Sequence, residues 1–149
     1  MSMVGRFNMQ MHIAQGDHNR RLAMELCNTG LSCRDWCITI AYYSAMHYVE
    51  FWLKTELCFD TSTKLRPHTE RNHKVTEHLS ADTARSYKKL YNLSNTLRYI
   101  SSGGEMAASV AGEWLSHEAV STAIERDLDK VITEITARLK SSCQEDQPQ

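Results

Sequence analysis

A short polar stretch, HTERNHKVTEH at residues 68–78, gathers three histidines and an arginine directly after Pro67. On an α-helix, Arg71 and His78 share one face, offset by about 20° around the axis and by about 10.5 Å along it. A guanidinium offers a fork of donors to phosphate oxygens, and an imidazole can take or give a proton near neutral pH. The two side chains could therefore flank a phosphodiester. RNA carries its own nucleophile, the 2′-OH, so such a site needs no metal and no cofactor. The alternative is an exposed helix with scattered polar side chains.

The same stretch contains a spacing that suits metal ligands. Glu70, His73 and Glu77 are three and four residues apart, which places them on one stripe of a helix. Metal sites inside helical bundles use Glu-x-x-His pairs, normally two of them. Only Glu70 and His73 are arranged in that direction here. A metal-binding bundle therefore remains an alternative to the phosphodiester site.

The apolar segment Trp36–Leu53 carries polar side chains that need partners if the segment is buried. Tyr43, His47 and Glu50 lie at helical positions i, i+4 and i+7, and so share a face. Because an unpaired buried polar group is costly, these three side chains could hydrogen-bond to residues 68–78 and support a site there. The alternative for His47 is a histidine whose hydrogen bonds are satisfied within the core.

Aromatic side chains further along the chain could bind a nucleobase. Tyr87 and Tyr91, with Arg98 beyond them, line one side of an expected helix and could stack on a base. Aromatic residues at helical spacing are more often core residues, so packing inside the protein is the alternative.

The elements that must position these side chains are helical throughout. The sequence has no sustained apolar–polar alternation and no Asn-Gly turn, and it contains only 6 Gly and 2 Pro. The spacing predicts helices over residues 8–29, 33–58, 68–79, 80–101 and from 116 onward. The expected boundary signals are Gly30, a capping box from Ser32 to Asp35, Ser80, Gly103-Gly104 and Ser116. The expected inner stripes are Leu90, Leu93, Leu97 and Ile100, and then Val120, Ile124, Leu128, Val131, Ile135 and Leu139. The predicted fold is all-α: residues 1–140 form one up-and-down bundle of four to five helices, and residues 141–149 form a disordered tail.

Composition is that of an ordinary globular protein. Of 149 residues, 42% are apolar and 23% are charged, and the net charge is −1. The charge is uneven, because residues 60–104 hold eight Lys or Arg and four Asp or Glu, whereas residues 105–149 hold four and nine. This layout could present a positive face to a phosphate-bearing ligand, but it is too weak for a general nucleic-acid binder.

The chain shows no sign of membrane insertion or secretion. Residues 36–53 are long enough to suggest a membrane span, but His47 and Glu50 lie inside them, so a buried central helix is expected. The first residues lack the apolar region of a secretory signal, and five cysteines, an odd number, favour reduced thiols in a cytoplasmic protein. The expected central helix is apolar nearly all round, which exceeds what a small bundle needs, so a homodimer is also expected.

Four sequence blocks in this order resemble the HEPN domains (higher eukaryotes and prokaryotes nucleotide-binding). The blocks are NRRLA, DWCITIAYYSAMHYVEFWL, PHTERNHKVTEH and LYNLSNTLRY, and the likeness covers roughly Asn19 to Leu139. The resemblance implies a helical bundle that dimerises. Many HEPN proteins are metal-independent endoribonucleases of toxin–antitoxin or defence systems. An antitoxin or a nucleotidyltransferase-like protein is the partner that this resemblance implies.

The HEPN signature is an arginine followed by a polar residue and, after four to six residues in all, a histidine. The segment RNHKVTEH fits it with Arg71, Asn72 and His78. The resemblance implies that Arg71 orients and neutralises the phosphate and that His78 acts as acid and base, with His47 and His68 in support. The alternative that it leaves open is a non-catalytic HEPN-like module for nucleotide or RNA binding or for oligomerisation.

Overall fold

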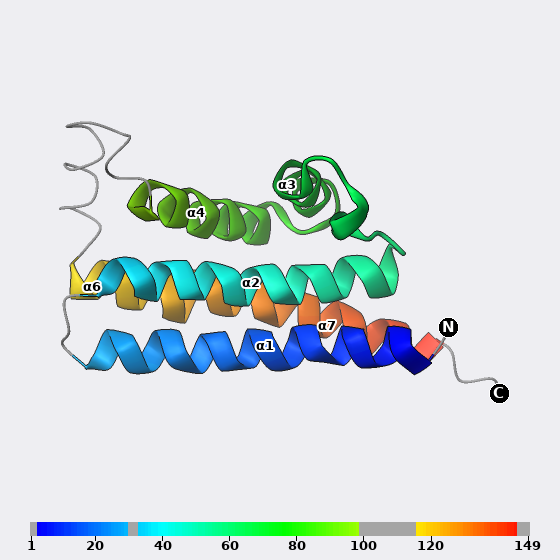
Figure 1. Ribbon diagram of the computed structural model, residues 1–149, viewed down its shortest axis with the longest axis horizontal. Coiled ribbons are helices and arrows are strands. Elements are labelled where there is room, and N and C mark those ends of the chain that lie inside the picture. The colour runs from blue at the N-terminus through cyan, green and yellow to red at the C-terminus, as the bar shows by residue number, and fades with distance from the viewer. Residues whose placement is uncertain (1–2, 30–32, 99–115, 146–149) are drawn as a thin grey trace.

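Long helices run up and down beside one another, and a shorter helix crosses one end of them (Figure 1). The computed structural model describes residues 3–29, 33–98 and 116–145. The helices are α1 (Met3–Asn28), α2 (Arg34–Glu56), α3 (Pro67–His78), α4 (Ala81–Arg98), α6 (His117–Thr122) and α7 (Asp129–Glu145), with a 3-10 turn, η1 (Thr61–Thr63), and a π-helical segment, η2 (Ala123–Leu128). These residues include no strand, so the predicted all-α bundle is confirmed.

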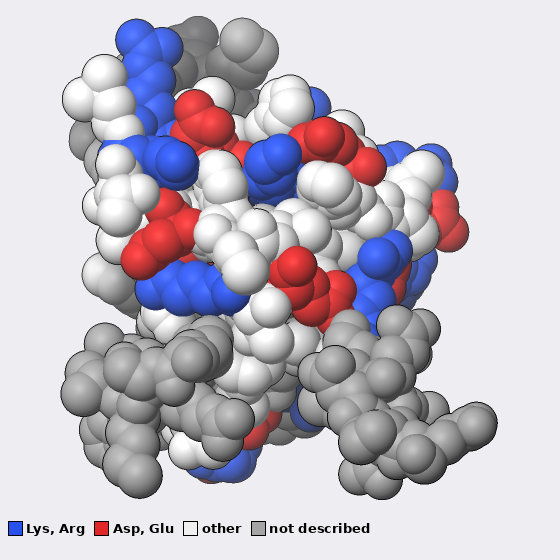
Figure 2. Space-filling view, turned by 90° about the vertical axis from the view of Figure 1, so that its right-hand side faces the viewer, with Lys and Arg blue, Asp and Glu red and all other residues white. Residues whose placement is uncertain are grey.

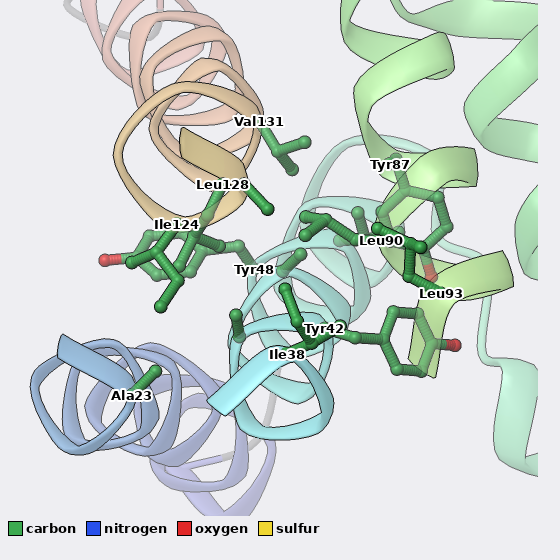
Figure 3. Packing of buried hydrophobic residues seen from close by; sticks show 14 of the residues in the cluster. Ala23, Ile38, Tyr42, Tyr48, Tyr87, Leu90, Leu93, Ile124, Leu128 and Val131 are labelled. Atoms are coloured by element: carbon green, nitrogen blue, oxygen red, sulfur yellow. The ribbon is translucent and has the colours of Figure 1, made fainter. Parts of the chain in front are cut away.

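The central position of α2 explains its apolar sequence. α1, α4 and α7 lie around it in Figure 1, and Figure 3 shows side chains from these helices and from η2 meeting in one core. The buried residues of α2 are Cys37, Ile38, Thr39, Ala41, Tyr42, Ser44, Ala45, Tyr48, Val49, Glu50, Trp52 and Leu53. Helices of the same chain cover α2, so its apolar surface does not require a second copy, and the homodimer stays a prediction.

Both ends of α2 are closed by backbone hydrogen bonds. Cys33 is the N-cap residue and its side chain makes no capping bond. The predicted capping box begins at Ser32, which lies outside the described residues. The Cys33 carbonyl accepts from the backbone N–H of Cys37 at 3.1 Å and so closes the first turn. At the other end, Cys58 has a φ of 48°, in the left-handed region. The chain reverses there, and the Phe59 N–H donates to the Leu53 carbonyl at 2.9 Å.

α1 and α2 approach closely at Gly16. A Cβ atom at this position would lie 2.8 Å from the Tyr48 ring, so only glycine fits without a shift. The Ser44 hydroxyl donates to the Gly16 carbonyl at 2.7 Å, and the Tyr48 hydroxyl donates to Asp17 at 2.5 Å. These bonds fix the register of the two helices against each other.

The final helix runs without a break from α6 through η2 to α7. Ser116 caps it as predicted, because its Oγ accepts from the Ala119 N–H at 3.1 Å. The predicted inner stripe is confirmed, with Leu139 packed at its edge: Val120, Ile124, Leu128, Val131 and Ile135 are buried. Val120, Ile124 and Leu128 are four residues apart, and in an ideal α-helix Leu128 would lie about 80° around the axis from Val120. The wider turn of a π-helix, with i→i+5 hydrogen bonds, absorbs that rotation and keeps Ile124 and Leu128 on the core.

α3 crosses the end of the bundle and leads directly into α4. Pro67 occupies its first turn, where a fixed φ suits a helix start and no backbone N–H is needed. Arg71 and Val75 are its buried residues. The Ser80 Oγ then accepts from the Thr83 N–H at 3.3 Å, which confirms Ser80 as the start of α4.

Some predicted features lie outside the described residues: Gly30, Ser32, Ile100 and Gly103-Gly104. α7 reaches Glu145, five residues into the segment predicted as a tail, so the helix is longer than its apolar stripe indicated. Leu90, Leu93 and Leu97 of the other predicted stripe are buried. Among the described helices, none has the length and apolar character needed to cross a bilayer.

Candidate functional site

Arg71 lies at the centre of a buried polar cluster between α2 and α3. Only 5% of Arg71 and 5% of Glu50 is exposed. The Nε of Arg71 donates to Glu50 Oε1 at 2.6 Å, and Nη2 pairs with the same oxygen. The Thr61 hydroxyl, from η1, also donates to Oε1. The predicted hydrogen bond between Glu50 and residues 68–78 is therefore formed, but the guanidinium binds a carboxylate of the protein and is turned away from solvent.

His68 closes this cluster on its outer side. Its Nδ1 lies 3.1 Å from Arg71 Nη1 and 3.4 Å from the Tyr42 hydroxyl. Because arginine can only donate, Nδ1 is the acceptor and the imidazole is neutral. Burial and the positive charges of Arg71 and Arg98 lower the pKa of His68. Burial also tends to lower the pKa of Arg71, but Tyr87 and Glu50 raise it above its ordinary value, so Arg71 stays charged.

His47 pairs with α1 and not with α3. Its Nδ1 lies 3.1 Å from Nδ1 of His12, and Nε2 of His12 lies 3.4 Å from the Lys54 Nζ. Lys54 can only donate, so His12 accepts at Nε2 and donates from Nδ1 to His47. Burial lowers the pKa of both histidines, with Lys54 adding to the effect for His12 and His12 adding to it for His47. The expected hydrogen bond between His47 and residues 68–78 is wrong, because His47 lies on α2 where this helix packs against α1 and His12 is its partner.

Tyr43 is turned towards α4. Its hydroxyl accepts from Nη1 of Arg98 at 3.1 Å, and the guanidinium of Arg98 lies 5.7 Å from the Tyr43 ring centroid. The predicted contact of Tyr43 with residues 68–78 is therefore also wrong. The neighbouring Tyr42 makes that contact instead, through His68. Adjacent residues of a helix point about 100° apart, so Tyr42 can contact α3 while Tyr43 contacts α4.

His78 has surroundings quite different from those of Arg71. Its ring meets the edge of Trp52 at a centroid distance of 6.2 Å, and its Nε2 lies 3.5 Å from Oε2 of Glu77. Among the described residues, no hydrogen bond or ion pair joins His78 to Arg71 or to a partner of Arg71. A phosphate held by both side chains would require Arg71 to leave Glu50.

A groove of about 260 Å³ lies between α3 and α4, and we call it the α3/α4 groove. Asn72, the third predicted catalytic residue, lines it together with His73, Tyr87, Lys88, Tyr91 and Asn92. The Oδ1 atom of Asn72 is buried and has no hydrogen-bond donor among the described residues. Tyr87 is buried in the wall, whereas Tyr91 is partly exposed. The groove thus combines aromatic rings, the side-chain amide of Asn72 and the exposed cation of Lys88.

The predicted metal stripe does not form a metal site in the part of the chain that the structure describes. No group of three or more His, Cys, Asp or Glu side chains is placed there to hold an ion. Of the stripe, His73 and Glu77 form an exposed pair at 3.5 Å. The cysteines whose side chains are described, Cys27, Cys33, Cys37 and Cys58, are free thiols. Burial and the neighbouring Cys33 raise the pKa of Cys37 to about 12, so this thiol is unreactive.

Charges of both signs alternate over the end of the bundle shown in Figure 2, and no single-sign field covers this face. Several cations of residues 60–98 meet carboxylates: Arg71 pairs with Glu50, Lys74 with Glu77, Arg85 with Asp82 and Lys89 with Asp127. Part of the positive charge in the middle of the sequence is therefore neutralised where the chain folds.

Sequence reasoning missed the partners that reach these side chains from other elements. Tyr42, Thr61 and His12 all contact a predicted residue, yet each is distant from it in the chain. For Thr61 the sequence did contain a local signal in Asp60. Its side chain accepts from the Ser62 N–H and orders the turn that contains Thr61. For His12 no local signal exists, because its partner lies 35 residues away.

No family model, no curated protein and no solved structure matches this chain significantly.

Proposed function

We propose that the protein is a non-catalytic module that binds a nucleotide or single-stranded RNA, with a base in the α3/α4 groove. The observation that carries the proposal is the content of this groove: the ring of Tyr91, the side chain of Asn72, and Lys88 in about 260 Å³. The HEPN resemblance supports the same class of ligand.

Each part of the groove suits a different part of a nucleotide. Bases stack on aromatic side chains with about 1–3 kcal/mol per base. A side-chain amide can exchange two hydrogen bonds with a base edge. The Oδ1 of Asn72 has no donor among the described residues, so turning this side chain towards a base in the groove breaks no hydrogen bond of that oxygen. The exposed ammonium of Lys88 can meet a phosphate. The volume is below the range of about 300–1,000 Å³ typical of drug-sized ligands, which suits one base rather than a large cofactor.

The engagement of Arg71 favours binding over catalysis. A catalytic arginine must point its donors at the phosphate, but Nε and Nη2 of Arg71 meet Glu50 and Nη1 meets His68. Releasing Arg71 would leave the Glu50 carboxylate buried without its cation, which is expensive. The endoribonuclease stays a prediction, and it has less support from the geometry than the binding module does.

Binding of a short fluorescent single-stranded RNA, followed by anisotropy, tests the proposal. Replacing Tyr91 with Leu keeps an apolar side chain and removes the π face, so affinity should fall by about 5- to 150-fold if one base stacks there. Lys88→Gln should weaken binding at low salt and flatten its dependence on salt concentration. Lys140→Gln is the matched control, because it removes one exposed positive charge from α7, outside the groove.

Two results would contradict the binding proposal: wild-type protein that binds no RNA or mononucleotide, or equal losses from Tyr91→Leu and Lys140→Gln. Incubating unlabelled RNA with the protein, with and without a chelator, tests the ribonuclease in parallel. Metal-independent cleavage that drops about 10²- to 10⁴-fold in His78→Ala would establish catalysis and replace the proposal. Sedimentation of the 17.1 kDa chain at tens of micromolar tests the predicted homodimer.

A further inference from the structure

A second groove lies on another side of α4, against the π-helical segment. It has a volume of about 360 Å³, and a hollow of about 350 Å³ adjoins it and shares Lys89 and Arg126 with it. We call the two together the π-segment groove. α4 forms one wall and η2 with its flanking turns forms the other, so none of the side chains that line the α3/α4 groove takes part.

Two pairs of cations face each other across this groove. Arg85 and Lys89 are four residues apart on α4, and Arg126 and Lys130 are four residues apart on the final helix. Like charges at this spacing disfavour a helix by about 0.2–0.5 kcal/mol per pair, so the arrangement is not explained by helix stability. The first hollow is lined by four cations and by two carboxylates, Asp82 and Asp127, a net charge of +2 in a chain whose net charge is −1.

Asp127 holds the cations in place from the floor of the groove. Its side chain is only 5% exposed and accepts from Lys89 Nζ at 2.7 Å, Ser86 Oγ at 3.2 Å and Arg126 Nε at 3.3 Å. Ala123, Ile124, Asp127 and Leu128 are all buried within the π segment, so its wide turn directs this carboxylate inward together with the core residues. π turns are frequent at functional sites, and here the turn supplies the anchor for two basic side chains.

We propose that the π-segment groove binds phosphate groups, with Arg126, Lys89 and Lys130 as the contacting cations. Arg126 is 60% exposed in its side chain, and Lys130 is exposed, so both can turn to a ligand without unfolding the chain. A guanidinium and two ammonium groups match the several acceptor oxygens of a phosphate. Glu118 lines the outer hollow, so the anion belongs near Lys89 and Arg126, where the two hollows meet. This inference does not rest on base binding in the α3/α4 groove.

Titration of the full chain with inorganic tripolyphosphate at about 50 mM salt, followed by backbone amide NMR, tests the proposal. The resonances that shift should belong to residues 82–89 and 122–130. Arg126→Gln should weaken binding by about tenfold, which is the value of one charge-assisted hydrogen bond. Lys130→Gln should weaken it less, because a lysine contributes a point charge and no planar fork.

Lys140→Gln is the control, because it removes the same unit of charge from the same helix outside the groove and should change affinity by less than about twofold. The proposal is overturned if tripolyphosphate shifts no resonance of the groove, or if Lys140→Gln weakens binding as much as Arg126→Gln. A short abasic deoxyribose-phosphate oligomer then identifies the source of the phosphate. Competition with tripolyphosphate assigns the groove to a nucleic-acid backbone, and no competition assigns it to the terminal phosphates of a nucleotide.

Discussion

Replacing Arg71 with Ala should destabilise the protein strongly, because it leaves the Glu50 carboxylate buried without its cation. Glu50 is 5% exposed and would keep only the Thr61 hydroxyl among the three donor groups that now meet its Oε1. Removing one partner from a buried ion pair typically costs about 3–5 kcal/mol. A second estimate comes from protonation: taking a glutamate that titrates near pH 4.3 in water to its neutral form at pH 7 costs about 3.7 kcal/mol. The two estimates agree, so we expect a loss of about 3–4 kcal/mol at pH 7.

The protonation route makes this prediction depend on pH. At pH 5 the same neutralisation costs only about 1 kcal/mol, so the penalty of Arg71→Ala relative to wild type should shrink to a third or less of its value at pH 7. Urea unfolding of both proteins at pH 7 and pH 5 measures this difference. In thermal unfolding at pH 7, the loss corresponds to a Tm lower by about 7–14 °C for a chain of this length.

Two variants control for other effects of the substitution. Arg85→Ala removes an arginine paired with Asp82 on an exposed surface, and it should cost no more than about 1 kcal/mol. The double variant Glu50→Leu with Arg71→Met replaces the whole pair with apolar groups, and it should be much more stable than Arg71→Ala alone. A loss below about 1 kcal/mol for Arg71→Ala at pH 7, or a loss that does not change with pH, would refute a structural role for this arginine.

Two partly buried imidazoles and one partly buried carboxylate give further pH-dependent predictions. The pKa values of His12 and His47 are lowered by burial, so the unfolded chain binds protons near pH 6.5 that the folded chain excludes; stability should fall between pH 7.5 and pH 5, and His47→Gln should reduce that slope in urea unfolding. Burial would raise the pKa of Glu134, but hydrogen bonds from Ser80 and Thr83 and pairing with Arg138 lower it to about 2. Its contribution should therefore be present above pH 4.5 and disappear towards pH 2, and Glu134→Gln should cost about 1–2 kcal/mol at pH 7, whereas the exposed Glu125→Gln should be close to neutral.

The helices and their inner faces could be predicted because their signals are local. Leu90, Leu93 and Leu97 repeat at the spacing of an α-helix, and every one of them is buried. Pro67 and Ser80 each favour a helix start at their own position, so they predicted where α3 and α4 begin. The π segment itself had no distinctive local signal, because successive four-residue steps occur both across it, from Val120 to Leu128, and in the α-helical stretch from Val131 to Leu139.

The candidate site was harder to predict, because its geometry depends on contacts between elements. The spacing of Arg71 and His78 is the same whether the guanidinium faces solvent or the core, and only Glu50 of α2 decides between them. Tyr43 was predicted to contact residues 68–78, but Tyr42 makes that contact and Tyr43 binds Arg98 of α4. The two tyrosines are adjacent in the chain, and their side chains lie on different faces of α2. The pairing of His47 with His12 required the register of α1 on α2, and no pattern within either helix encodes it.

The π turn also sets the rotational register of everything that follows it in the final helix. The π segment holds about one residue more than an α-helix would over the same rotation, so converting Ala123–Leu128 to α geometry at unchanged length would rotate α7 by about 100° relative to α6. Asp129 would then swing away from Arg20 of α1, and Glu134 away from the backbone of Ser80. The contacts of α7 with the first helix and with the start of α4 therefore depend on the wide turn.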